Sequence, residues 1–386
     1  MRQTAFLAVA VVLSVGASAA ETAGRGLGLT VAEDGTLIKD GRPYRAIGVN
    51  YFNAFSRHLK DPKDTGYEEG FRALAEAGIP FARMMGCGFW PSEQKPYLEN
   101  KDEFFRRFDD VVKSAEKHGV GLIPSLFWHI PTAPDLVGEP VSEWGNTQSK
   151  THDYLRNYVK DVVTRYKDSP AIWGWEFGNE FNLGANLPNA AEHRPQVVPQ
   201  LGTPKSRSEK DEWTYEIIRT AFAAFAAEVR KYDSYRAIST GDAFPRDGAW
   251  HNWKEKKWTK DTPEQFAEML LGDNPDPVSI VSVHAYGDEG RRIRQAQPIA
   301  AKARKPLFVG EFGAPGPQEK GEAEFQSLLS AIEESHVPLA ALWVYDFIGQ
   351  KEWSVTATNE RSYQLRAIGE ANKRIRAALA AESAGK

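Results

Sequence analysis

The sequence predicts an α/β fold of the (β/α)8 TIM-barrel class, with a β-hairpin before the first barrel strand. Short apolar segments typical of buried strands alternate with longer segments in which apolar residues recur at helical spacing. Eight strand–helix units can be counted, and such alternation predicts a parallel sheet that closes at eight strands. The chain has 386 residues, 41% hydrophobic and 26% charged, which is enough for one barrel of about 250 residues or more.

The first twenty residues have the pattern of a signal peptide. Met1-Arg2 is a short basic start, residues 5–15 are apolar, and Ala17-Ser18-Ala19-Ala20 offers small residues for cleavage near Ala19-Ala20 or Ala20-Glu21. The apolar run is shorter than the roughly 20 residues that cross a bilayer, which argues against a membrane anchor. We therefore expect a secreted or periplasmic protein in which residues 21–386 form a single barrel domain.

The elements follow one another in a regular order. Turn signals at Asp34-Gly35 and Asp40-Gly41 divide residues 29–47 into β-like runs, which indicates the hairpin. The expected barrel strands span residues 44–50, 79–85, 120–128, 171–177, 235–240, 278–284, 306–311 and 339–345. The expected helices span residues 67–77, 102–118, 153–166, 209–232, 262–271, 287–302, 322–335 and 361–380. The longest irregular loop is Asn182 to Arg207, and a loop of this length is more often functional than a surface insertion.

Charge and cysteine content narrow the possible functions. The formal net charge is −4 with no basic run, so nucleic acid and anionic membrane surfaces are poor partners. Cys87 is the only cysteine, which excludes an internal disulfide. A catalytic thiol needs a matched histidine base, so we expect Cys87 to be packed or to line a cleft.

Polar and aromatic side chains follow six of the eight predicted strands, at the end where a barrel places its active site. They are Arg83, His129, Asn179 with Glu180, His284 with Tyr286, Glu311, and Trp343. Each of them alone is a weak signal, because a single histidine on a strand is usually a core residue with its hydrogen bonds satisfied. Their convergence at one end of the barrel predicts a functional site.

Two of these side chains are carboxylic acids on the fourth and seventh strands, which face each other across a barrel. Such a pair suits glycoside hydrolysis, in which one protonated carboxyl donates to the leaving oxygen and one ionised carboxylate attacks the sugar carbon. Burial raises a carboxyl pKa, whereas a nearby cation or hydrogen-bond donor lowers it. We expect Arg83 and Tyr286 to keep Glu311 ionised, and Glu180 to remain protonated.

The segments Trp175-Glu176-Phe177-Gly178-Asn179-Glu180 and Phe308-Val309-Gly310-Glu311-Phe312-Gly313 resemble glycoside hydrolase family 5, the cellulase and β-mannanase family of clan A. The resemblance covers essentially the whole mature chain and implies a retaining hydrolase of β-1,4-linked mannan or glucan. It implies that Glu180 is the acid/base and Glu311 the nucleophile. It also implies sugar-binding roles for Arg83, His129, Asn179, His284, Tyr286 and Trp343, with Asn179 on the 2-hydroxyl and Trp343 as a platform.

One departure from the family pattern leaves the substrate open. Family endoglucanases usually read Asn-Glu-Pro, whereas this chain reads Asn179-Glu180-Phe181. Phe181 and the loop that follows it are expected to shape the cleft, so that mannan and glucan both remain candidates. We expect a carbohydrate substrate, no cofactor, no metal and a monomeric protein.

Three other functions are compatible with parts of the pattern. An exo-acting or β-galactosidase-like hydrolase of the same clan would share both glutamates and differ only in the cleft. A non-catalytic carbohydrate-binding barrel predicts loss of one catalytic glutamate, and both are present. A metal-dependent hydrolase could use His129, His284, Glu180 and Glu311, but the eight histidines are scattered and lack the close spacing of a metal motif.

Overall fold

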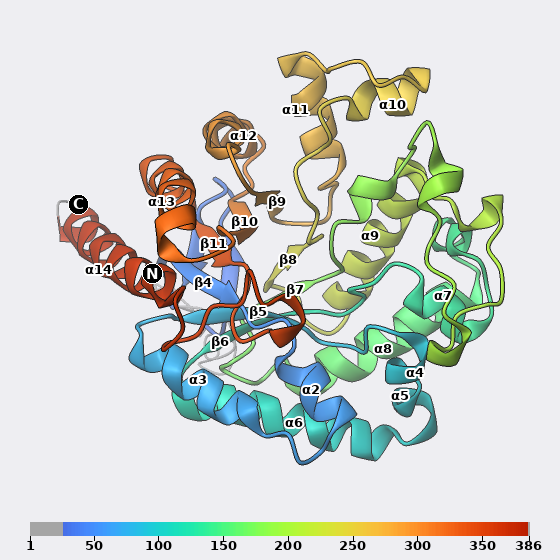
Figure 1. Cartoon of the computed structure of the whole chain (residues 1–386), viewed down its shortest axis with the longest axis horizontal. Helices are drawn as coiled ribbons and strands as arrows, with labels where there is room; N and C mark the ends of the chain where they lie inside the picture. The colour runs from blue at the N-terminus through green and yellow to red at the C-terminus, as the bar shows by residue number, and fades with distance from the viewer. Residues whose placement is uncertain (1–25, 385–386) are drawn as a thin grey trace, which may run out of the picture.

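The structure, a computed structural model that describes residues 26–384, contains a barrel of eight parallel strands (Figure 1). In chain order the strands are β4 (Ala46–Asn50), β5 (Phe81–Met85), β6 (Gly121–Ser125), β7 (Gly174–Glu176), β8 (Ala237–Ser239), β9 (Val281–Ala285), β10 (Leu307–Phe312) and β11 (Leu339–Leu342). Consecutive strands are neighbours in the sheet, and β11 pairs with β4. The remaining edge is bridged where the Ser279 and Ile280 N–H groups donate to the Ile238 carbonyl at 3.0 and 3.1 Å. The predicted (β/α)8 barrel is confirmed.

Helices surround the barrel, one after each strand. They are α3 (Gly66–Glu76), α6 (Lys101–His118), α8 (Lys150–Tyr166), α9 (Tyr215–Arg230), α11 (Pro263–Gly272), α12 (Gly290–Lys302), α13 (Gln318–Glu334) and α14 (Ser362–Ala384). Helix α6 begins where the Asn100 side chain accepts a hydrogen bond from the Glu103 N–H, and it ends at Gly119 with a φ of 68°. Its buried face consists of residues at helical spacing, including Phe104, Phe108, Val111 and Ala115.

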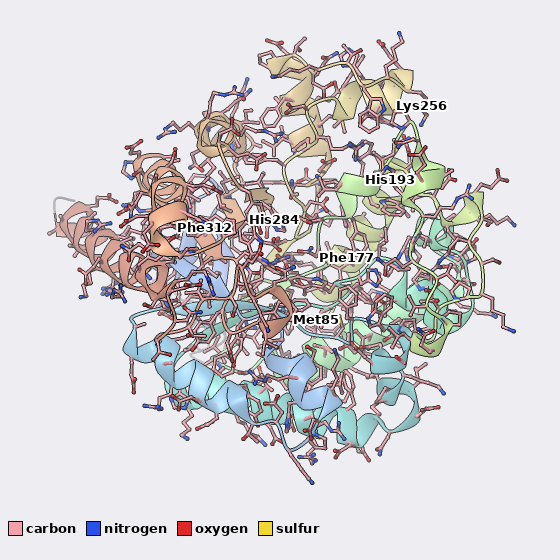
Figure 2. The ribbon with its side chains drawn as sticks, viewed as in Figure 1. Met85, Phe177, His193, Lys256, His284 and Phe312 are labelled. Atoms are coloured by element: carbon pink, nitrogen blue, oxygen red, sulfur yellow. The ribbon has the colours of Figure 1, made fainter. Side chains whose placement is uncertain are left out.

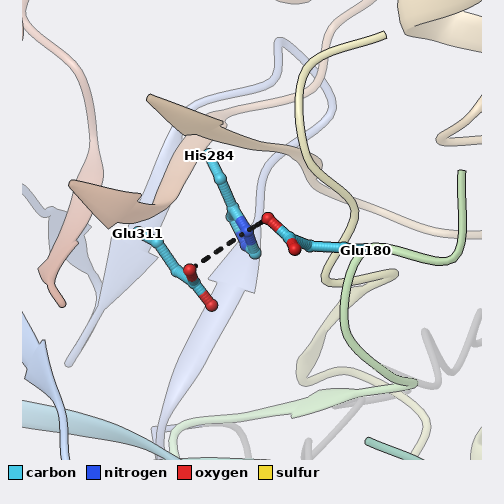
Figure 3. Close-up of side chains that lie close together, drawn as sticks. All are labelled: Glu180, His284 and Glu311. Atoms are coloured by element: carbon cyan, nitrogen blue, oxygen red, sulfur yellow. Dashed lines mark hydrogen bonds and ion pairs between the residues drawn. The ribbon is translucent and has the colours of Figure 1, made fainter. Parts of the chain in front are cut away.

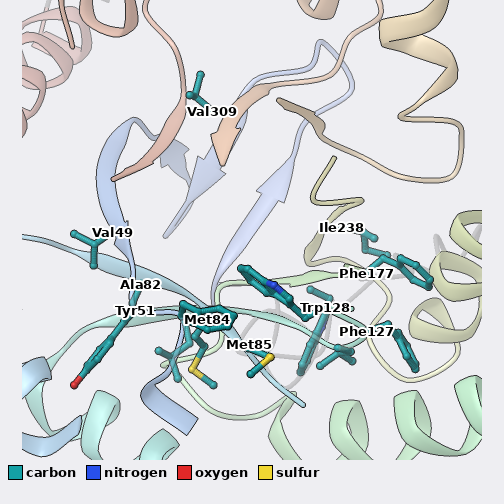
Figure 4. Packing of buried hydrophobic residues seen from close by; sticks show 14 of the residues in the cluster. Val49, Tyr51, Ala82, Met84, Met85, Phe127, Trp128, Phe177, Ile238 and Val309 are labelled. Carbon is teal, nitrogen blue, oxygen red and sulfur yellow. The ribbon is translucent and has the colours of Figure 1, made fainter. Parts of the chain in front are cut away.

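Aromatic side chains fill the layer between the strand ends and the helices. Phe127 and Phe177, just beyond β6 and β7, point away from the barrel toward the helices (Figure 4). The Phe127 ring centroid lies 5.9 Å from that of Tyr158 on α8, and the Phe177 centroid lies 5.4 Å from that of Phe225 on α9. This packing fixes the positions at which the chain leaves β6 and β7.

The N-terminal hairpin is in fact a small sheet of three antiparallel strands, β1 (Leu29–Val31), β2 (Leu37–Lys39) and β3 (Arg42–Pro43). Leu29 and Leu37 are buried in a cluster with Trp173 and other residues from the starts of the barrel strands. The Leu29 N–H also donates to the Trp173 carbonyl at 2.7 Å. The sheet therefore covers the N-terminal end of the barrel, and the opposite end remains for a site.

Element boundaries differ from the prediction mainly around the loops. The expected helix over 209–232 begins only at Tyr215, because Thr214 caps it by accepting from the Ile217 N–H. Short helices that the sequence did not predict occupy loops: α2 (Ala54–Lys60), α4 (Pro91–Gln94), α5 (Pro96–Glu99), α7 (Thr132–Val137) and α10 (Ala249–Glu255).

None of the helices among residues 26–384 is long and apolar enough to cross a membrane. The signal peptide predicted for residues 1–20, with its cleavage site, lies outside the described residues.

Candidate active site

Glu180 and Glu311 face each other at the C-terminal end of the barrel (Figure 3). Glu311 lies near the end of β10 and is only 4% exposed, whereas the side chain of Glu180, in the segment after β7, is 31% exposed. His284 of β9 lies between them, with Nδ1 2.8 Å from Glu180 Oε1 and 3.5 Å from Glu311 Oε2. One oxygen of each carboxyl group and a nitrogen of His284 all lie within 4.8 Å of one another.

A β-bulge in β10 sets the orientation of Glu311. Val309 pairs with Val283, but the next pair along the two strands is Glu311 with His284, so Gly310 is the extra residue. A Cβ atom on Gly310 would lie 2.9 Å from His284 Nε2, which explains why glycine is needed there. The bulge places Glu311 directly beside His284.

Arg83 of β5 is fully buried beneath the two glutamates and uses its whole guanidinium group. Its Nη1 donates to Glu311 Oε1 at 2.9 Å, and its Nη2 donates to Asn179 Oδ1 at 2.9 Å. Its Nε donates to Glu176 Oε1 at 2.6 Å, while Nη1 also reaches Asn50 Oδ1 at 3.0 Å. Arg83 thereby joins the ends of three strands and holds Asn179 with its oxygen turned inward, which leaves the amide nitrogen to face the cleft.

The environments of the two carboxyls differ in their positive and donor groups. Burial raises the pKa of Glu311 above its usual value and the charge of Glu180 adds to this, although His284, Arg83 and a 2.6 Å hydrogen bond from the Tyr286 hydroxyl act to lower it. Burial also raises the pKa of Glu180, against which only the more distant charge of Arg83 acts. Two carboxyls this close do not both ionise readily. Burial lowers the pKa of His284 to about 4, so the imidazole between them is neutral at neutral pH.

The cleft above the carboxyls has a volume of about 520 Å³ and walls that are largely aromatic. Trp343, which follows β11, is held by a 2.7 Å hydrogen bond from its Nε1 to Gln350 Oε1. Its ring lies nearly parallel to that of Trp128, with centroids 6.1 Å apart. The other lining residues are Phe52, Phe89, Asn179, Tyr286, Phe347 and Trp353, with the two glutamates. Flat aromatic faces beside a carboxyl pair suit the apolar faces of sugar rings.

Seven of the eight residues predicted for the site converge on this cleft or on the network beneath it, and His129 does not. Its Nδ1 lies 3.3 Å from the Phe89 carbonyl, and its ring stacks on that of Phe89 with centroids 4.3 Å apart. His129 is therefore behind Phe89 rather than among the lining residues, and its sugar-binding role stays a prediction.

Phe181 and the loop of residues 182–207 do not shape this cleft. Phe181 is 2% exposed and packs with ring centroids 5.2 Å from Phe177, in the aromatic layer outside the barrel. Among the described residues, none from 182 to 207 lines the cleft. Figure 2 shows His193, within this loop, well apart from His284. Among the tryptophans of other loops, Trp144 is fully buried, and Trp90, Trp250, Trp253 and Trp258 do not line the cleft.

Sequence reasoning missed two buried polar residues of the network. Asn50 ends β4 and donates from Nδ2 to the Gly310 carbonyl at 2.8 Å, which fixes the bulge. Glu176 ends β7, is fully buried, and accepts from Arg83, from Ser125 and from Ser239. A polar residue at the end of an otherwise apolar strand is the signal that could have found both.

Glu180, His284 and Glu311 also form the one group of at least three potential metal ligands found among the described residues. Three protein ligands would be enough for a catalytic zinc ion. However, both oxygens of Glu311 already accept hydrogen bonds, from Arg83 and Tyr286. The guanidinium charge 2.9 Å away opposes a second cation, so the arrangement favours a carboxyl pair over a metal centre.

Comparison with known proteins identifies a family whose model matches most of this chain. The family model described as cellulase, glycosyl hydrolase family 5, matches residues 39–347. Mannan endo-1,4-beta-mannosidase F of Aspergillus clavatus is 37% identical over 227 residues, which cover 54% of this chain and 44% of that protein. Mannan endo-1,4-beta-mannosidase 7 of Arabidopsis thaliana is 23% identical over 315 residues, which cover 71% of this chain and 65% of that protein. The match thus spans about half the length of the first relative.

Solved structures agree with the fold. The endo-1,4-beta-mannanase of Rhizomucor miehei has a TM-score of 0.66 at 15% identity, with 90% of this chain and 99% of that chain covered. A protein of Streptomyces cattleya described as GH5_18, in complex with GlcNAc, has a TM-score of 0.60 at 17% identity, with 86% and 80% covered. At these identities the likeness concerns the barrel and its helices.

Proposed function

The chain belongs to the cellulase family, glycosyl hydrolase family 5, and we propose on that basis that it hydrolyses a β-1,4-linked polysaccharide or its oligosaccharides with retention of configuration. The observation that supports retention is the spacing of the two carboxyls, whose nearest atoms lie within 4.8 Å. Retaining glycosidases need a separation of about 5–5.5 Å, whereas inverting enzymes need about 6.5–9.5 Å to admit a water molecule.

In the first step Glu180 donates its proton to the glycosidic oxygen while Glu311 attacks the anomeric carbon. The bond between that carbon and the leaving oxygen breaks, and a glycosyl ester forms on Glu311. Glu180, now ionised, then removes a proton from the water that cleaves the ester. Arg83 and Tyr286 stabilise the carboxylate of Glu311 before attack and after release, and Asn179 is placed to bind the sugar 2-hydroxyl.

Mannan is the substrate we propose first, because the relatives at 37% and 23% identity are both described as mannan endo-1,4-beta-mannosidases. β-Glucan is the second candidate, in keeping with the cellulase description of the family. We propose endo action on the same grounds as mannan. A fall in viscosity that precedes the release of reducing sugar distinguishes endo action from exo action.

The test is activity on β-mannan, β-glucan, xylan and aryl glycosides for the wild type, Glu180→Gln and Glu311→Gln, with the exposed Glu69→Gln as control. Wild type and control should cleave one of the β-linked polymers, and the two site variants should lose at least 100-fold in rate. Azide should restore activity to Glu311→Ala with formation of a glycosyl azide of inverted configuration. An inactive wild type on every substrate, or full activity in Glu311→Gln, would refute the proposal.

We also propose that the protein is exported and acts as a monomer. The basic, apolar and small-residue pattern of residues 1–20 supports export. The mass of the protein purified from its natural host should correspond to a chain that begins near Ala20 or Glu21, and a full-length mass would contradict export. Light scattering tests the oligomeric state.

A further inference from the structure

The turn that follows Glu180 requires outside support to hold its shape. Glu180 has a φ of 57°, a left-handed conformation that strains a non-glycine residue, and it leads into the 3₁₀ turn η2 (Phe181–Gly184). Its own N–H donates to the Gly241 carbonyl at 3.0 Å. A catalytic acid on so short a turn depends on its neighbours for its position.

The segment just after β8, from Gly241 to Arg246, forms hydrogen bonds with both ends of this turn. At its N–H end, Asp242 Oδ1 accepts from the Asn182 N–H at 3.2 Å. At its carbonyl end, Arg246 donates to the Asn182 carbonyl at 3.1 Å, to the Ala185 carbonyl at 2.7 Å and to the Leu183 carbonyl. A hydrogen-bond acceptor at the N–H end and a guanidinium at the carbonyl end satisfy backbone groups that a short helical turn leaves without partners. We call Asp242 and Arg246 the turn clamp.

The side chain of Asn182 ties the turn to the same segment from inside. Its Nδ2 donates to the Ala243 carbonyl at 2.8 Å and to Asp273 Oδ2 at 2.9 Å, and its Oδ1 accepts from the Ala243 N–H at 3.3 Å. Asn182, Asp242 and Asp273 are at most 1% exposed. Because water does not reach these groups, no solvent hydrogen bond replaces one that a substitution removes.

The turn clamp lies outside the cleft and does not contact the space in which a sugar would bind. Neither Asp242 nor Arg246 is a lining residue. Burial raises the pKa of Asp242 well above its usual range, the neighbouring Asp273 raises it further, and the N–H groups of Asn182 and Phe181 lower it. A buried carboxyl group destabilises a fold unless it is hydrogen-bonded, and the partner of Asp242 Oδ1 is the N–H of Asn182 in the turn.

We propose that Asp242 and Arg246 are positioning residues for Glu180: they hold the Phe181–Gly184 turn so that the carboxyl group of Glu180 stays beside His284 and opposite Glu311. The inference rests on the proposed function, because it assigns to the clamp the geometry of proton donation. It predicts a loss confined to the step that needs an acid.

The test compares two substrates for each variant. The dinitrophenolate of a dinitrophenyl glycoside leaves without being protonated, whereas a sugar leaving group needs a proton from the acid. In both cases kcat/KM reports the step in which the leaving group departs. For Asp242→Ala, kcat/KM should fall about 100-fold on the oligosaccharide and stay within about threefold on the dinitrophenyl glycoside. Asp242→Asn keeps an acceptor oxygen for the Asn182 N–H and should restore the wild-type ratio between the substrates. Arg246→Lys is a milder change that keeps the charge. It should also lower the ratio of kcat/KM on the oligosaccharide to kcat/KM on the dinitrophenyl glycoside.

Asn372→Ala is the matched control, because Asn372 is 2% exposed and holds backbone groups of Ile47 at the opposite end of the barrel. Asn372→Ala should lose stability but keep the wild-type ratio of kcat/KM between the two substrates. Equal losses on both substrates in Asp242→Ala and Arg246→Lys would overturn the inference and indicate a purely structural clamp. A wild type that cleaves neither substrate would refute the proposed function instead. If Asp242→Ala does not fold, Arg246→Lys decides the outcome by the same ratio.

Discussion

Arg83 Nη1 lies 2.9 Å from Glu311 Oε1, and both side chains are buried. The same guanidinium is neutralised on its other side by Glu176, whose Oε1 lies 2.6 Å from Nε. Glu176→Gln should therefore destabilise the protein by about 3–5 kcal/mol, because it leaves part of a buried charge uncompensated. It should also shift the acid limb of the pH–rate profile to lower pH, since the less neutralised Arg83 holds the pKa of Glu311 lower.

Urea unfolding and the pH dependence of kcat/KM measure the two effects of Glu176→Gln. Arg72→Ala is the control, because it breaks pairs with Glu69 and Glu76 in which all three side chains are at least half exposed. The control should leave both the unfolding midpoint and the acid limb unchanged. An acid limb that moves to higher pH in Glu176→Gln would contradict this account of the network.

Tyr286→Phe isolates the second group that favours an ionised Glu311. The hydroxyl donates to Glu311 Oε2 at 2.6 Å, and a hydrogen bond to a charged group contributes about 1.5–3 kcal/mol. Its removal should lower kcat/KM by about 10–100-fold and move the acid limb of the profile to higher pH. If Tyr286→Phe keeps the wild-type kcat/KM and its acid limb does not move, Arg83 is sufficient to keep Glu311 ionised without the hydroxyl. The ring should still pack on Trp353, so the unfolding midpoint serves as the internal control.

The sequence was sufficient for the barrel and for most of the site because both follow from periodicity. Strand–helix alternation located all eight strands, and the rule that barrel sites lie at strand ends located Arg83, Glu180 and Glu311. His129 follows the third strand but packs behind Phe89, because the strand-end rule carries no side-chain direction, and its role stays a prediction. Phe181 was expected to shape the cleft because it stands where the family usually has proline, but it packs into the aromatic layer, a direction that the motif does not carry.

The turn clamp was beyond prediction from the sequence. Asp242 and Asn182 are far apart in the chain and meet only because β7 and β8 are adjacent in the barrel. Nothing in the local sequence around Asp242 distinguishes a buried acid from one in an exposed loop. Long-range contacts of this kind depend on register and loop paths, which hydrophobic patterns leave undetermined.

Asp273→Asn should change how stability depends on pH. Burial raises the pKa of Asp273 from 3.8 to about 7, so between these values the folded chain holds a proton that the unfolded chain has released. The free energy of unfolding therefore falls as pH rises through this window, by up to about 1.4 kcal/mol per pH unit. Asparagine does not titrate, so Asp273→Asn should show a flatter slope from pH 4 to 7 and greater relative stability at pH 8.

Asp233→Asn is the control for that measurement, because its buried carboxyl is shifted the other way. Burial raises the pKa of Asp233, but hydrogen bonds from Trp175 and Arg236 outweigh it and lower the pKa overall. Asp233→Asn should thus lose stability at neutral pH and gain none at pH 8. Equal slopes for wild type and Asp273→Asn would contradict the raised pKa of Asp273.

Chelation should leave the activity unchanged. Glu311 has no oxygen without a hydrogen-bond donor, and Arg83 supplies the positive charge that a metal would otherwise provide. Incubation with EDTA followed by desalting should preserve kcat and KM within experimental error, and added Zn²⁺ should not increase kcat. A loss on chelation that one divalent metal reverses would instead support a centre formed by Glu180, His284 and Glu311.

Trp343→Ala should weaken sugar binding at the point of cleavage. The ring borders the cleft beside both glutamates, and its orientation is fixed by Gln350 and by the nearly parallel Trp128. Loss of an aromatic face of this size should cost about 1.5–3 kcal/mol of binding, or about 10–100-fold in kcat/KM, and Trp343→Phe should recover part of it. Gln350→Ala should give a smaller loss, because the ring remains but is free to turn.

Trp258→Ala is the matched control, since Trp258 is 60% exposed and does not line the cleft. A control that loses as much as Trp343→Ala would indicate that the sugar-binding surface extends to the α10–α11 region and that the platform is not confined to the carboxyl pair.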